Sequence, residues 1–572
     1  MSFVISPEKF QNSVKEGDIY IKGDYYKNKN GFAVKQGEIF NYNDKELFNK
    51  IHTKGTSLIL RLKGEFLLVW YDKKLKRIYI GNDKLGREIL FYFYDKKRFI
   101  LSNDFWEIVN IIEPNKFDID VQSVKEFLIF NRPLFFKTII KNLNFFPPAS
   151  IGNFSIKDRA FNIDNYWDFK YTPEDNLSLD EAIERLDLLL TNSLKRIKEQ
   201  HNPNAIYGFG LSGGMDSRLI PHYALKHKMK LKGFIIGEKK PHKLFLSRDH
   251  ASARKIAKFY KLRLYDIPYN SISFYEKAYS GLKFVPMVNS RLFDTVGESK
   301  FPKFGVLLTG MNGGEIFGNL MPPNIQTLNK KQLVDKIISS FSLAYEQQNI
   351  FKRTLLKGEL NKRINPLIDK KAYIKAKQKI EKFVETEIRK DKTNVDIFQK
   401  YVFFLIQNNK YGAFGMFFKK GNYSIFSDTH IIEESLRWKP TFLINRKLQT
   451  QFFLKKFPEL AKIPSQDFQP AIFYRDKKSI FRKVLAIIEF ILRGAGVVRY
   501  SKWSREKLYL DFAKKVLSKH NNIFENIFDI KHIQTLKNIP SNLVKIKLLL
   551  DIIENKSYNL LLKENYLIKK YN

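Results

Sequence analysis

Residues 206–228 read IYGFGLSGGMDSRLIPHYALKHK, in which an apolar run is followed by a glycine turn and then by apolar residues at helical spacing. The apolar run at Ile206–Leu211 indicates a buried strand. Two more such strands are predicted at Leu231–Ile236 and Val306–Thr309, and a helical stretch at Ser247–Tyr260 lies between them. Strands that alternate with helices in this way are typical of a parallel α/β sheet.

The turn itself has the composition of a phosphate site. Gly213 and Gly214 allow the backbone to turn tightly and to present N–H groups to an anion. The hydroxyl groups of Ser212 and Ser217 add donors, and the amino end of the following helix adds partial positive charge. The sequence therefore predicts phosphate binding at the carboxyl end of a parallel strand.

Asp216 is the unexpected member of this turn, because a carboxylate repels phosphate unless a cation lies between the two groups. We therefore expect Mg²⁺ beside Asp216. The turn lacks the Gly-Lys-Ser/Thr ending of a Walker A loop, so γ-phosphoryl transfer of that type is not indicated. An ordinary glycine-rich turn between a strand and a helix is the alternative interpretation.

Three regions are predicted along the chain. Residues 1–172 contain short alternating or apolar runs closed by Gly, Asn and Asp, which is typical of an antiparallel β-rich domain. These runs are IYIKGDYY, SLILRLKGEFLLVWYD, RIYIGND, ILFYFYD and RFILSND. A helix follows, where Ser178 and Glu181 have the spacing of a capping box, and it opens the parallel α/β domain at residues 173–480. Residues 481–572 are basic and amphipathic, and we expect a helical extension of the parallel domain.

The composition excludes several kinds of chemistry. The 572 residues include no cysteine, which removes disulfides, thiolate-bound zinc, iron–sulfur clusters and a cysteine nucleophile. The nine histidines show no HExxH or clustered spacing, so a zinc site is not indicated. The net charge is +41, but the basic residues are scattered, so a surface specific for nucleic acid is not indicated.

No targeting or membrane-spanning segment is predicted, and we expect the protein in the cytoplasm. The apolar run at Val484–Leu492 is too short to span a bilayer and carries Glu489. The wider segment Lys478–Lys507 has an apolar helix face, basic flanks and Trp503, which would suit contact with an anionic membrane surface. The favoured interpretation is a helix packed on the core with a solvated basic face.

Several motifs together resemble those of the asparagine synthetase-like ATP pyrophosphatases, enzymes that split ATP to AMP and pyrophosphate while they adenylate a carboxylate. Ser-Gly-Gly-x-Asp-Ser after a strand resembles the pyrophosphate loop of that family. Thr309–Gly318, TGMNGGEIFG, resembles its second glycine loop, and Tyr166–Asp168 resembles the element that closes its N-terminal domain. The later segments IFSDTHIIEESLRWKP, NRKLQTQFFLKKFPELAKIP and YRDKKS resemble those that frame the acceptor site.

This resemblance implies a role for each loop residue. It assigns the phosphates of ATP to Ser212, Gly213, Gly214 and Ser217. It assigns other contacts with the nucleotide to Leu211, Ile236, Thr309 and Gly310, and Mg²⁺ to Asp216 and Glu315. It also implies catalytic roles for Asp428 and for Lys477, whose charge would stabilise the adenylation transition state. For Lys477, a solvated surface lysine is the alternative in so lysine-rich a chain.

The N-terminal region resembles the class II glutamine amidotransferase domain that accompanies these synthetases, an antiparallel domain of the Ntn type. The resemblance rests on Gln36–Asn41, Gly64–Phe66, Tyr71-Asp72 and Asp83–Arg87. Such domains use a processed N-terminal cysteine as nucleophile, whereas this chain has Ser2, whose hydroxyl is a poorer nucleophile. Gln36 also replaces the glutamine-binding asparagine of the family. We therefore expect a scaffold without glutaminase activity.

The synthetase region departs from the family at two acids. Gly314 stands where the second loop of the family carries an aspartate that binds Mg²⁺, which leaves Glu315 as the local carboxylate. Gly421 stands where the family has a glutamate seven residues before the position of Asp428. That acid would help to deprotonate or orient the acceptor amine, so its loss puts this function in doubt.

The resemblance implies an ATP-dependent, AMP-forming ligase that adenylates a carboxylate and passes it to ammonia or an amine. The carboxylate is expected on a small molecule, a peptide or a sugar acid. The sequence leaves open an intramolecular cyclase that forms a lactam or macrocycle, and a degenerate scaffold without activity. A homodimer and a separate subunit that supplies ammonia also remain open.

Overall fold

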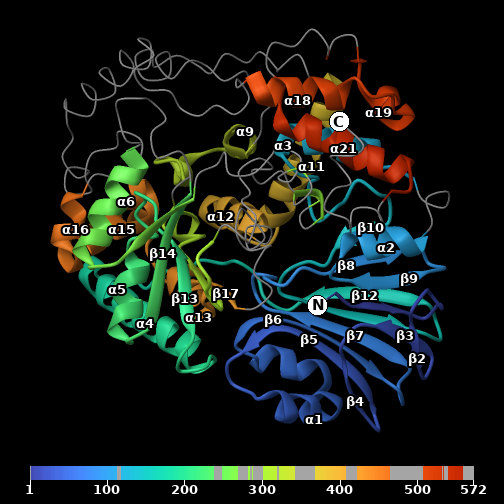
Figure 1. The fold of residues 1–572 in the computed structure, drawn as a ribbon, viewed down its shortest axis with the longest axis horizontal. Helices are drawn as coiled ribbons and strands as arrows, with labels where there is room; N and C mark the ends of the chain where they lie inside the picture. The colour runs from blue at the N-terminus through green and yellow to red at the C-terminus, as the bar shows by residue number, and fades with distance from the viewer. Residues whose placement is uncertain are drawn as a thin grey trace.

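The computed structural model describes residues 2–112, 118–236, 248–267, 301–318, 321–341, 368–406, 421–463, 507–530 and 539–557, with a few single positions between them. Figure 1 shows an antiparallel β domain in blue, a parallel α/β domain in green, and C-terminal helices in red that lie beside the antiparallel domain. Lys477, Val484–Leu492 and all but the last residue of Lys478–Lys507 lie outside the described residues.

The N-terminal domain contains two antiparallel sheets of six strands each. The first has the order β10-β8-β9-β1-β3-β2. Its strands are β1 (Val4–Ser6), β2 (Val14–Glu16), β3 (Ile19–Lys22), β8 (Phe91–Tyr94), β9 (Phe99–Ser102) and β10 (Leu143–Phe145). The second has the order β12-β11-β7-β6-β5-β4. Its strands are β4 (Tyr26–Asn28), β5 (Gly31–Ile39), β6 (Gly64–Asp72), β7 (Arg77–Asn82), β11 (Ser150–Ser155) and β12 (Ala160–Asn165).

The two sheets face each other across an apolar core, because alternate residues of their strands point inward. Ile5 and Ile21 of the first sheet meet Val69 and Ile80 of the second in one buried cluster. The outer faces are covered by helices, namely α1 (Asp44–Lys54) and η1 (Gly55–Arg61) on the second sheet and α2 (Phe105–Ile112) and α3 (Val121–Phe130) on the first. The antiparallel β-rich domain predicted from the sequence is confirmed.

One of the predicted strand runs is wrong in part. The residues SLILR were included in a strand, but they lie in η1, a 3₁₀ helix. Leu58 and Ile59 are both buried although they are neighbours, and Leu60 is 60% exposed. A strand would place Leu58 and Ile59 on opposite faces, whereas a helical turn places both against Trp70 and Phe66 of the sheet.

The second domain is built on a parallel sheet of five strands with the order β15-β14-β13-β16-β17. The strands are β13 (Ile206–Gly210), β14 (Lys230–Ile236), β15 (Leu264–Ile267), β16 (Val306–Thr309) and β17 (Asn422–Ser424). All four pairings are parallel, as the alternation of strands and helices predicted. The carboxyl ends of β13, β14 and β16 therefore meet at one edge, which carries Leu211, Ile236 and Thr309.

Helices surround this sheet and connect it to the first domain (Figure 1). They are α4 (Leu179–Glu199), α5 (Leu219–Lys226), α6 (Arg248–Phe259), α8 (Gly313–Ile316), η5 (Ile325–Thr327), α9 (Lys330–Phe341), α11 (Lys370–Ile388), α12 (Asn394–Ile406), η8 (Ile425–Ser427), α13 (Thr429–Ser435), α14 (Pro440–Leu443), η9 (Ile444–Arg446), α15 (Lys447–Lys456) and α16 (Pro458–Lys462). The predicted N-cap of α4 is present, since the Ser178 hydroxyl accepts a hydrogen bond of 3.1 Å from the Glu181 amide, while the Glu181 carboxylate accepts from Arg185.

Ion pairs and backbone hydrogen bonds hold the two domains together. Asp168 follows the last strand of the first domain and pairs with Lys392 at 3.2 Å and with Lys400 of α12 at 2.8 Å. The Thr172 amide donates to the Leu436 carbonyl at 2.9 Å. These contacts of Asp168 and Thr172 attach the segment between the two domains to the second domain.

The C-terminal helices pack against the antiparallel domain. They are α18 (Lys507–Leu517), α19 (Asn522–Ile527) and α21 (Ser541–Glu554). Their apolar side chains share one buried cluster with those of α2 and α3. The Asn542 side chain of α21 donates a 2.6 Å hydrogen bond to the Leu128 carbonyl near the end of α3. We expected residues 481–572 to extend the parallel domain; the helices described in this region cover the apolar faces of α2 and α3, the helices outside the first sheet.

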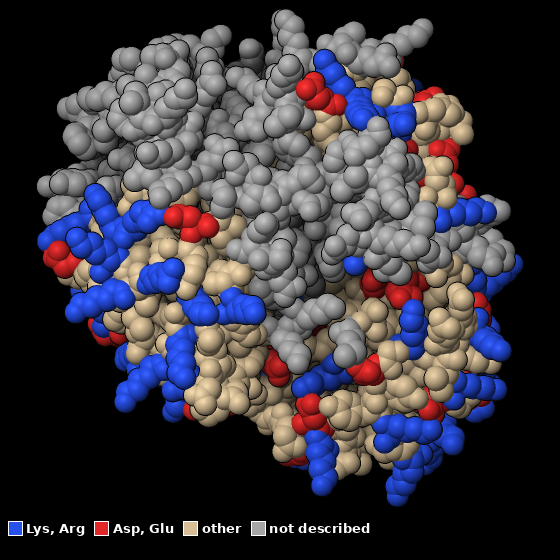
Figure 2. All heavy atoms as spheres, viewed as in Figure 1, with Lys and Arg blue, Asp and Glu red and all other residues tan. Residues whose placement is uncertain are grey.

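Figure 2 shows that lysine and arginine side chains are spread over the face in view, with acidic side chains among them. Many of the basic groups are paired, as in the contacts between Lys125 and Asp369 and between Lys379 and Glu126. Among the helices that the structure describes, none has the length and apolar character needed to cross a membrane.

Candidate nucleotide site

The glycine turn between β13 and α5 is held in shape by its own serines. The Ser212 amide donates to the Ser217 hydroxyl oxygen at 3.1 Å, and the two hydroxyl oxygens lie 3.0 Å apart. The Gly214 amide donates to the Ser212 hydroxyl at 3.1 Å. The Leu211 amide is bonded to the Phe234 carbonyl of β14, so the turn begins directly from the sheet. Both hydroxyl groups and the amides of the turn are therefore gathered in one small loop.

Arg218 fixes the outer side of this turn. Its side chain is fully buried and donates to the carbonyls of Gly213 at 2.7 Å and Gly214 at 3.0 Å. The same guanidinium donates to the carbonyls of Leu460 and Ile463 at the end of α16. These bonds fix the carbonyls of the turn and attach the turn to a distant part of the chain.

The Gly213 amide already binds an anionic oxygen. It donates a 2.5 Å hydrogen bond to a carboxylate oxygen of Asp249, in the first turn of α6. A backbone amide of a glycine turn that holds a carboxylate offers the same donor to a phosphate oxygen. The Gly213 amide is thus bonded to Asp249 in this structure, and phosphate binding at the turn stays a prediction.

The second glycine loop lies directly against the first. A Cβ atom on Gly310 would come within 2.9 Å of backbone atoms of Asp216 and Ser217. A Cβ atom on Gly313 would come within 2.7 Å of the Asp216 carboxyl carbon. Real Cβ atoms are not found at such distances, so both positions require glycine for this approach. The structure therefore brings together the two loops that the sequence placed in one site.

Asp216 has two partners that the sequence analysis did not identify. Its Oδ1 atom accepts from the Arg446 guanidinium at 3.1 Å and from the Gln449 amide at 2.5 Å. Asn445 and Arg446 both adopt positive φ angles, 56° and 57°, which break the helix at the start of α15. Asparagine at such a position is a weak sign of this turn, but nothing in the sequence indicates that Arg446 reaches Asp216.

Glu315 lies half-buried in the single turn of α8, close enough to Asp216 for their charges to interact. Burial raises the pKa of Glu315, and the Asp216 charge raises it further, while the Arg446 charge acts in the opposite direction. The Glu315 carbonyl accepts a hydrogen bond from Gln399 of α12, which holds the loop against that helix. Asp216 and Glu315 are thus the two carboxylates of the paired loops.

These donors fit one Mg²⁺ ion that is bound together with phosphate. Mg²⁺ in nucleotide sites usually takes one or two protein carboxylates and completes its shell with phosphate oxygens and water. Asp216 and Glu315 meet that requirement, and Gly314 offers no third group. In the part of the chain that the structure describes, no three His, Asp or Glu side chains are grouped as a metal site on their own.

The remaining predicted nucleotide contacts lie at the same edge of the sheet. Ile236 ends β14 and is half-buried, and Leu211 continues from β13. Thr309 ends β16, and its buried hydroxyl donates to the Tyr423 carbonyl of β17 at 3.4 Å. Lys477 lies outside the described residues and stays a prediction.

Asp428 lies at the junction between the two domains, and its catalytic role stays a prediction. It is 8% exposed, caps α13 by accepting from the His430 amide at 2.9 Å, and pairs with Arg196 of α4. Burial raises its pKa, but the hydrogen bond from His430 and the Arg196 charge outweigh this and leave the pKa lowered. The residue lines a small cavity between the domains with Phe40 and Glu65. Within this junction the Asp428 carboxylate is paired with Arg196 and His430.

Gly421, at the position of the family's acid before β17, adopts a backbone conformation that favours glycine. Its φ angle is +59°, and a Cβ atom there would lie 3.2 Å from both His201 and Tyr423. A glutamate would be strained in this backbone conformation and crowded by two rings. A glutamate at this position would therefore require the backbone to change its conformation.

Ser2 lies at the exposed start of β1. The neighbouring Phe3 amide is bonded to the Asn103 side chain at 2.9 Å, which fixes the chain at the edge of the first sheet. Gln36 lies in β5 opposite Leu67. Among the described residues, no side chain is hydrogen-bonded to the Ser2 hydroxyl, and so none is placed there as a general base.

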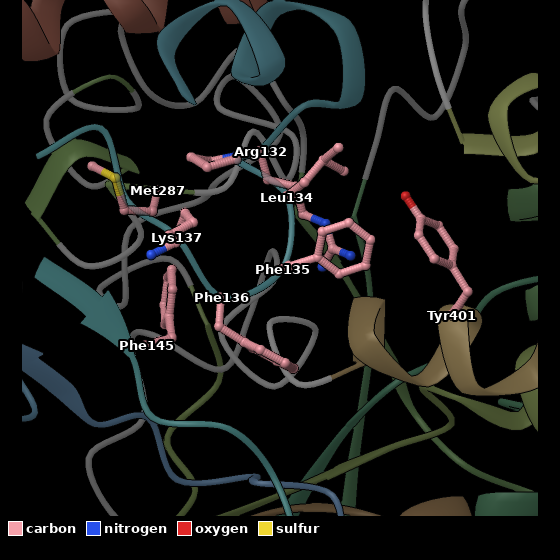
Figure 3. Close-up of a pocket in the computed structure, with 9 residues that line it drawn as sticks. Arg132, Leu134, Phe135, Phe136, Lys137, Phe145, Met287 and Tyr401 are labelled. Carbon is pink, nitrogen blue, oxygen red and sulfur yellow. The ribbon is translucent and has the colours of Figure 1, made fainter. Parts of the chain in front are cut away.

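A separate pocket lies at the junction between the antiparallel domain and α12 (Figure 3). Phe135 and Phe136 line it and adopt positive φ angles of 50° and 62°. Burial lowers the pKa of Arg132 to about 10, although the nearby Tyr401 acts to raise it. None of the glycine-loop residues lines this pocket, so it is distinct from the candidate nucleotide site.

Comparisons with known proteins match the first domain to a family and much of the chain to a relative. The family described as glutamine amidotransferase domain matches residues 14–167. A Methanocaldococcus jannaschii protein assigned as glutamine-hydrolysing asparagine synthetase 2 is 26% identical over 385 residues, which cover 61% of this chain and 73% of that protein.

Among solved structures, the match to glutamine phosphoribosylpyrophosphate amidotransferase from B. subtilis is 10% identical, with a TM-score of 0.20, and covers 54% of this chain and 75% of that one. The match to a U34-tRNA thiolase from Methanococcus maripaludis is 10% identical, with a TM-score of 0.16, and covers 38% and 80%. TM-scores this low leave the fold to be judged from the sheets of the chain itself. The chain is thus similar to a protein assigned as an asparagine synthetase, and its residues 14–167 match the glutamine amidotransferase domain.

Proposed function

We propose that the protein is an ATP-dependent, AMP-forming amide ligase that adenylates a carboxylate and passes the acyl group to ammonia or an amine. The observation that carries this proposal is the close contact of two glycine loops around Asp216 at the carboxyl edge of a parallel sheet. Ligands of open α/β sheets bind at this edge. The similarity to a protein assigned as asparagine synthetase supports the same reaction.

The residues of the first loop would bind the phosphates. The Ser212 and Ser217 hydroxyls, now bonded to each other, would turn towards the β- and γ-phosphate oxygens. The Gly213 amide would exchange the Asp249 carboxylate for a phosphate oxygen. Mg²⁺ held by Asp216 and Glu315 would neutralise phosphate charge and make pyrophosphate a better leaving group.

The rest of the reaction follows from holding the nucleotide in place. With pyrophosphate fixed by the loop, the α-phosphate would be open to a carboxylate oxygen of the substrate, which displaces pyrophosphate and forms an acyl-adenylate. The amine then attacks the acyl carbon and AMP leaves. Positioning of two substrates in this way is one of the larger sources of catalysis available to an enzyme.

The nitrogen source is proposed to be ammonia or a substrate amine, because Ser2 stands where the resembling family has its cysteine nucleophile. A small molecule, a peptide or a sugar acid would supply the carboxylate, and an amine within the same molecule would give a lactam or a macrocycle. We place this activity in the cytoplasm.

The test is exchange of labelled pyrophosphate into ATP by the purified full-length chain, with Mg²⁺ and a panel of amino, peptide and sugar acids. Exchange that depends on one of these acids is expected, because adenylation is reversible while pyrophosphate is present. Failure of every acid, together with no detectable ATP binding, would contradict the proposal. Ammonia release from glutamine by the wild type, lost in Ser2→Ala, would overturn the proposed nitrogen source.

A further inference from the structure

Arg446 lies at the centre of the site without an assigned role. Its guanidinium contacts the Asp216 carboxylate at 3.1 Å, and its side chain is 15% exposed. Gln449, one turn further along α15, donates to the same carboxylate oxygen at 2.5 Å. The positive φ angles of Asn445 and Arg446 direct the chain into this position. The positively charged Arg446 side chain therefore contacts Asp216, the carboxylate that is predicted to bind a metal ion.

The contact of Arg446 with Asp216 makes the net charge of the site less negative. A pair of loops with an aspartate on each would present two negative charges to the phosphates, and both would need divalent metal to offset them. Here Gly314 removes one of these charges, and Arg446 balances the other at Asp216. Glu315 and Asp249 are the other carboxylates that lie beside the loops in the described part of the chain. The repulsion that metal must overcome is thus smaller.

We propose that Arg446 is a phosphate-binding residue that takes over part of the charge neutralisation otherwise supplied by Mg²⁺, so that ATP binds this site with weak dependence on divalent metal. This inference rests on the proposed function. Arginine suits the role, since its guanidinium stays charged and forms paired hydrogen bonds with phosphate oxygens.

The contact between Gly213 and Asp249 supports this placement. The two glycine loops touch at Asp216, so the Asp249 carboxylate on the Gly213 amide and the Arg446 guanidinium on Asp216 are held by adjoining parts of one site. A phosphate chain that replaces Asp249 at the amide would bring its negative charge beside Arg446. The guanidinium could then share its donors between Asp216 and the phosphate.

The test is equilibrium binding of ATP to the full chain, in Mg²⁺ and again in EDTA, for the wild type, Arg446→Gln, Arg446→Lys and Lys447→Gln. Lys447 is exposed and adjacent to Arg446, so its variant removes the same charge outside the contact with Asp216. We expect the wild type and Lys447→Gln to lose less than about tenfold in affinity on passing from Mg²⁺ to EDTA.

Arg446→Gln is expected to lose about 10- to 100-fold more than the wild type in EDTA, the range for a hydrogen bond between charged groups, and to recover most of it in Mg²⁺. Arg446→Lys should keep most of the binding in EDTA. Melting temperatures near that of the wild type would show that the variants are folded.

Two results would overturn the inference. If the wild type binds ATP in Mg²⁺ but not in EDTA, and Arg446→Gln behaves in the same way, then Arg446 does not replace metal charge while the proposed function stands. If the wild type binds no ATP under either condition, both the inference and the proposed function fail.

Discussion

Asp428 keeps the position of the motif carboxylate and is paired within the protein. Its oxygens are bonded to Arg196 and to His430, on the side of the site that faces the antiparallel domain. A buried carboxylate between two such donors stays ionised and stabilises the elements that carry them. We therefore infer that Asp428 holds α4 and α13 in position at the domain junction.

This environment makes a prediction about pH. The folded-state pKa of Asp428 lies below its ordinary value of 3.8. The stability that it contributes is therefore fully present at neutral pH and is lost as the pH falls through the folded-state pKa. Asp428→Asn should cost about 2 kcal/mol at pH 7, a fall of roughly 4 °C in melting temperature.

The measurement is calorimetric melting of both proteins between pH 7 and pH 3, where the difference should shrink below about pH 4. Asp118→Asn is the matched control, because Asp118 is 76% exposed in its pair with Lys141. A deficit in Asp428→Asn that stays constant over this pH range would contradict the account.

At the scale of single helices and strands, short sequence patterns predicted much of the secondary structure. The strands β13, β14 and β16 and the cap of α4 follow from apolar runs and from Ser178, because each depends on residues close together in the sequence. The helical turn η1 was missed, since a short apolar run does not separate strand from helix. Arg446 was missed because its partner Asp216 is 230 residues away.

The link between the glycine turn and α16 gives a second prediction. Arg218 is fully buried and donates to four carbonyls, two in the turn and two at the end of α16. Arg218→Met would leave buried carbonyls without donors, at a cost of about 3 kcal/mol. We expect a lower melting temperature and loss of ATP binding together.

The control for this variant is Arg437→Met, which removes a side chain that is 55% exposed and paired with Glu174. Arg437→Met should melt within about 1 °C of the wild type, as expected for an exposed pair. The interpretation of Arg218 would be wrong if Arg218→Met melted and bound ATP as the wild type does.

At the scale of the whole molecule, the C-terminal helices complete the antiparallel domain. The helix α21 is buried along almost its entire length, and its apolar residues join those of α2 and α3 in one cluster. This partnership joins segments about 400 residues apart, so the local sequence pattern showed the helices and not the surface that they cover. We therefore expect the stability of the antiparallel domain to depend on the C-terminal helices.

A chain that ends at residue 506 should therefore expose the apolar outer faces of α2 and α3. We expect it to bind a hydrophobic dye strongly and to be cleaved rapidly by protease within residues 2–172, whereas a chain that ends at residue 557 should resist both. Equal dye binding and equal protection of the two proteins would show that the C-terminal helices are dispensable for the first domain.

We propose that the two glycine loops around Asp216 form a nucleotide site, and ATP binding to Gly310→Ala is the sharpest test of that site. Its added methyl group would lie 2.9 Å from the backbone of Asp216 and Ser217, whereas Gly305→Ala adds the same group where nothing lies within 4 Å. Measured by calorimetry, Gly310→Ala should bind ATP at least about tenfold more weakly than the wild type, and Gly305→Ala should bind it equally well. A wild type that binds no ATP, or a Gly310→Ala variant that binds it as tightly as the wild type, would contradict the account.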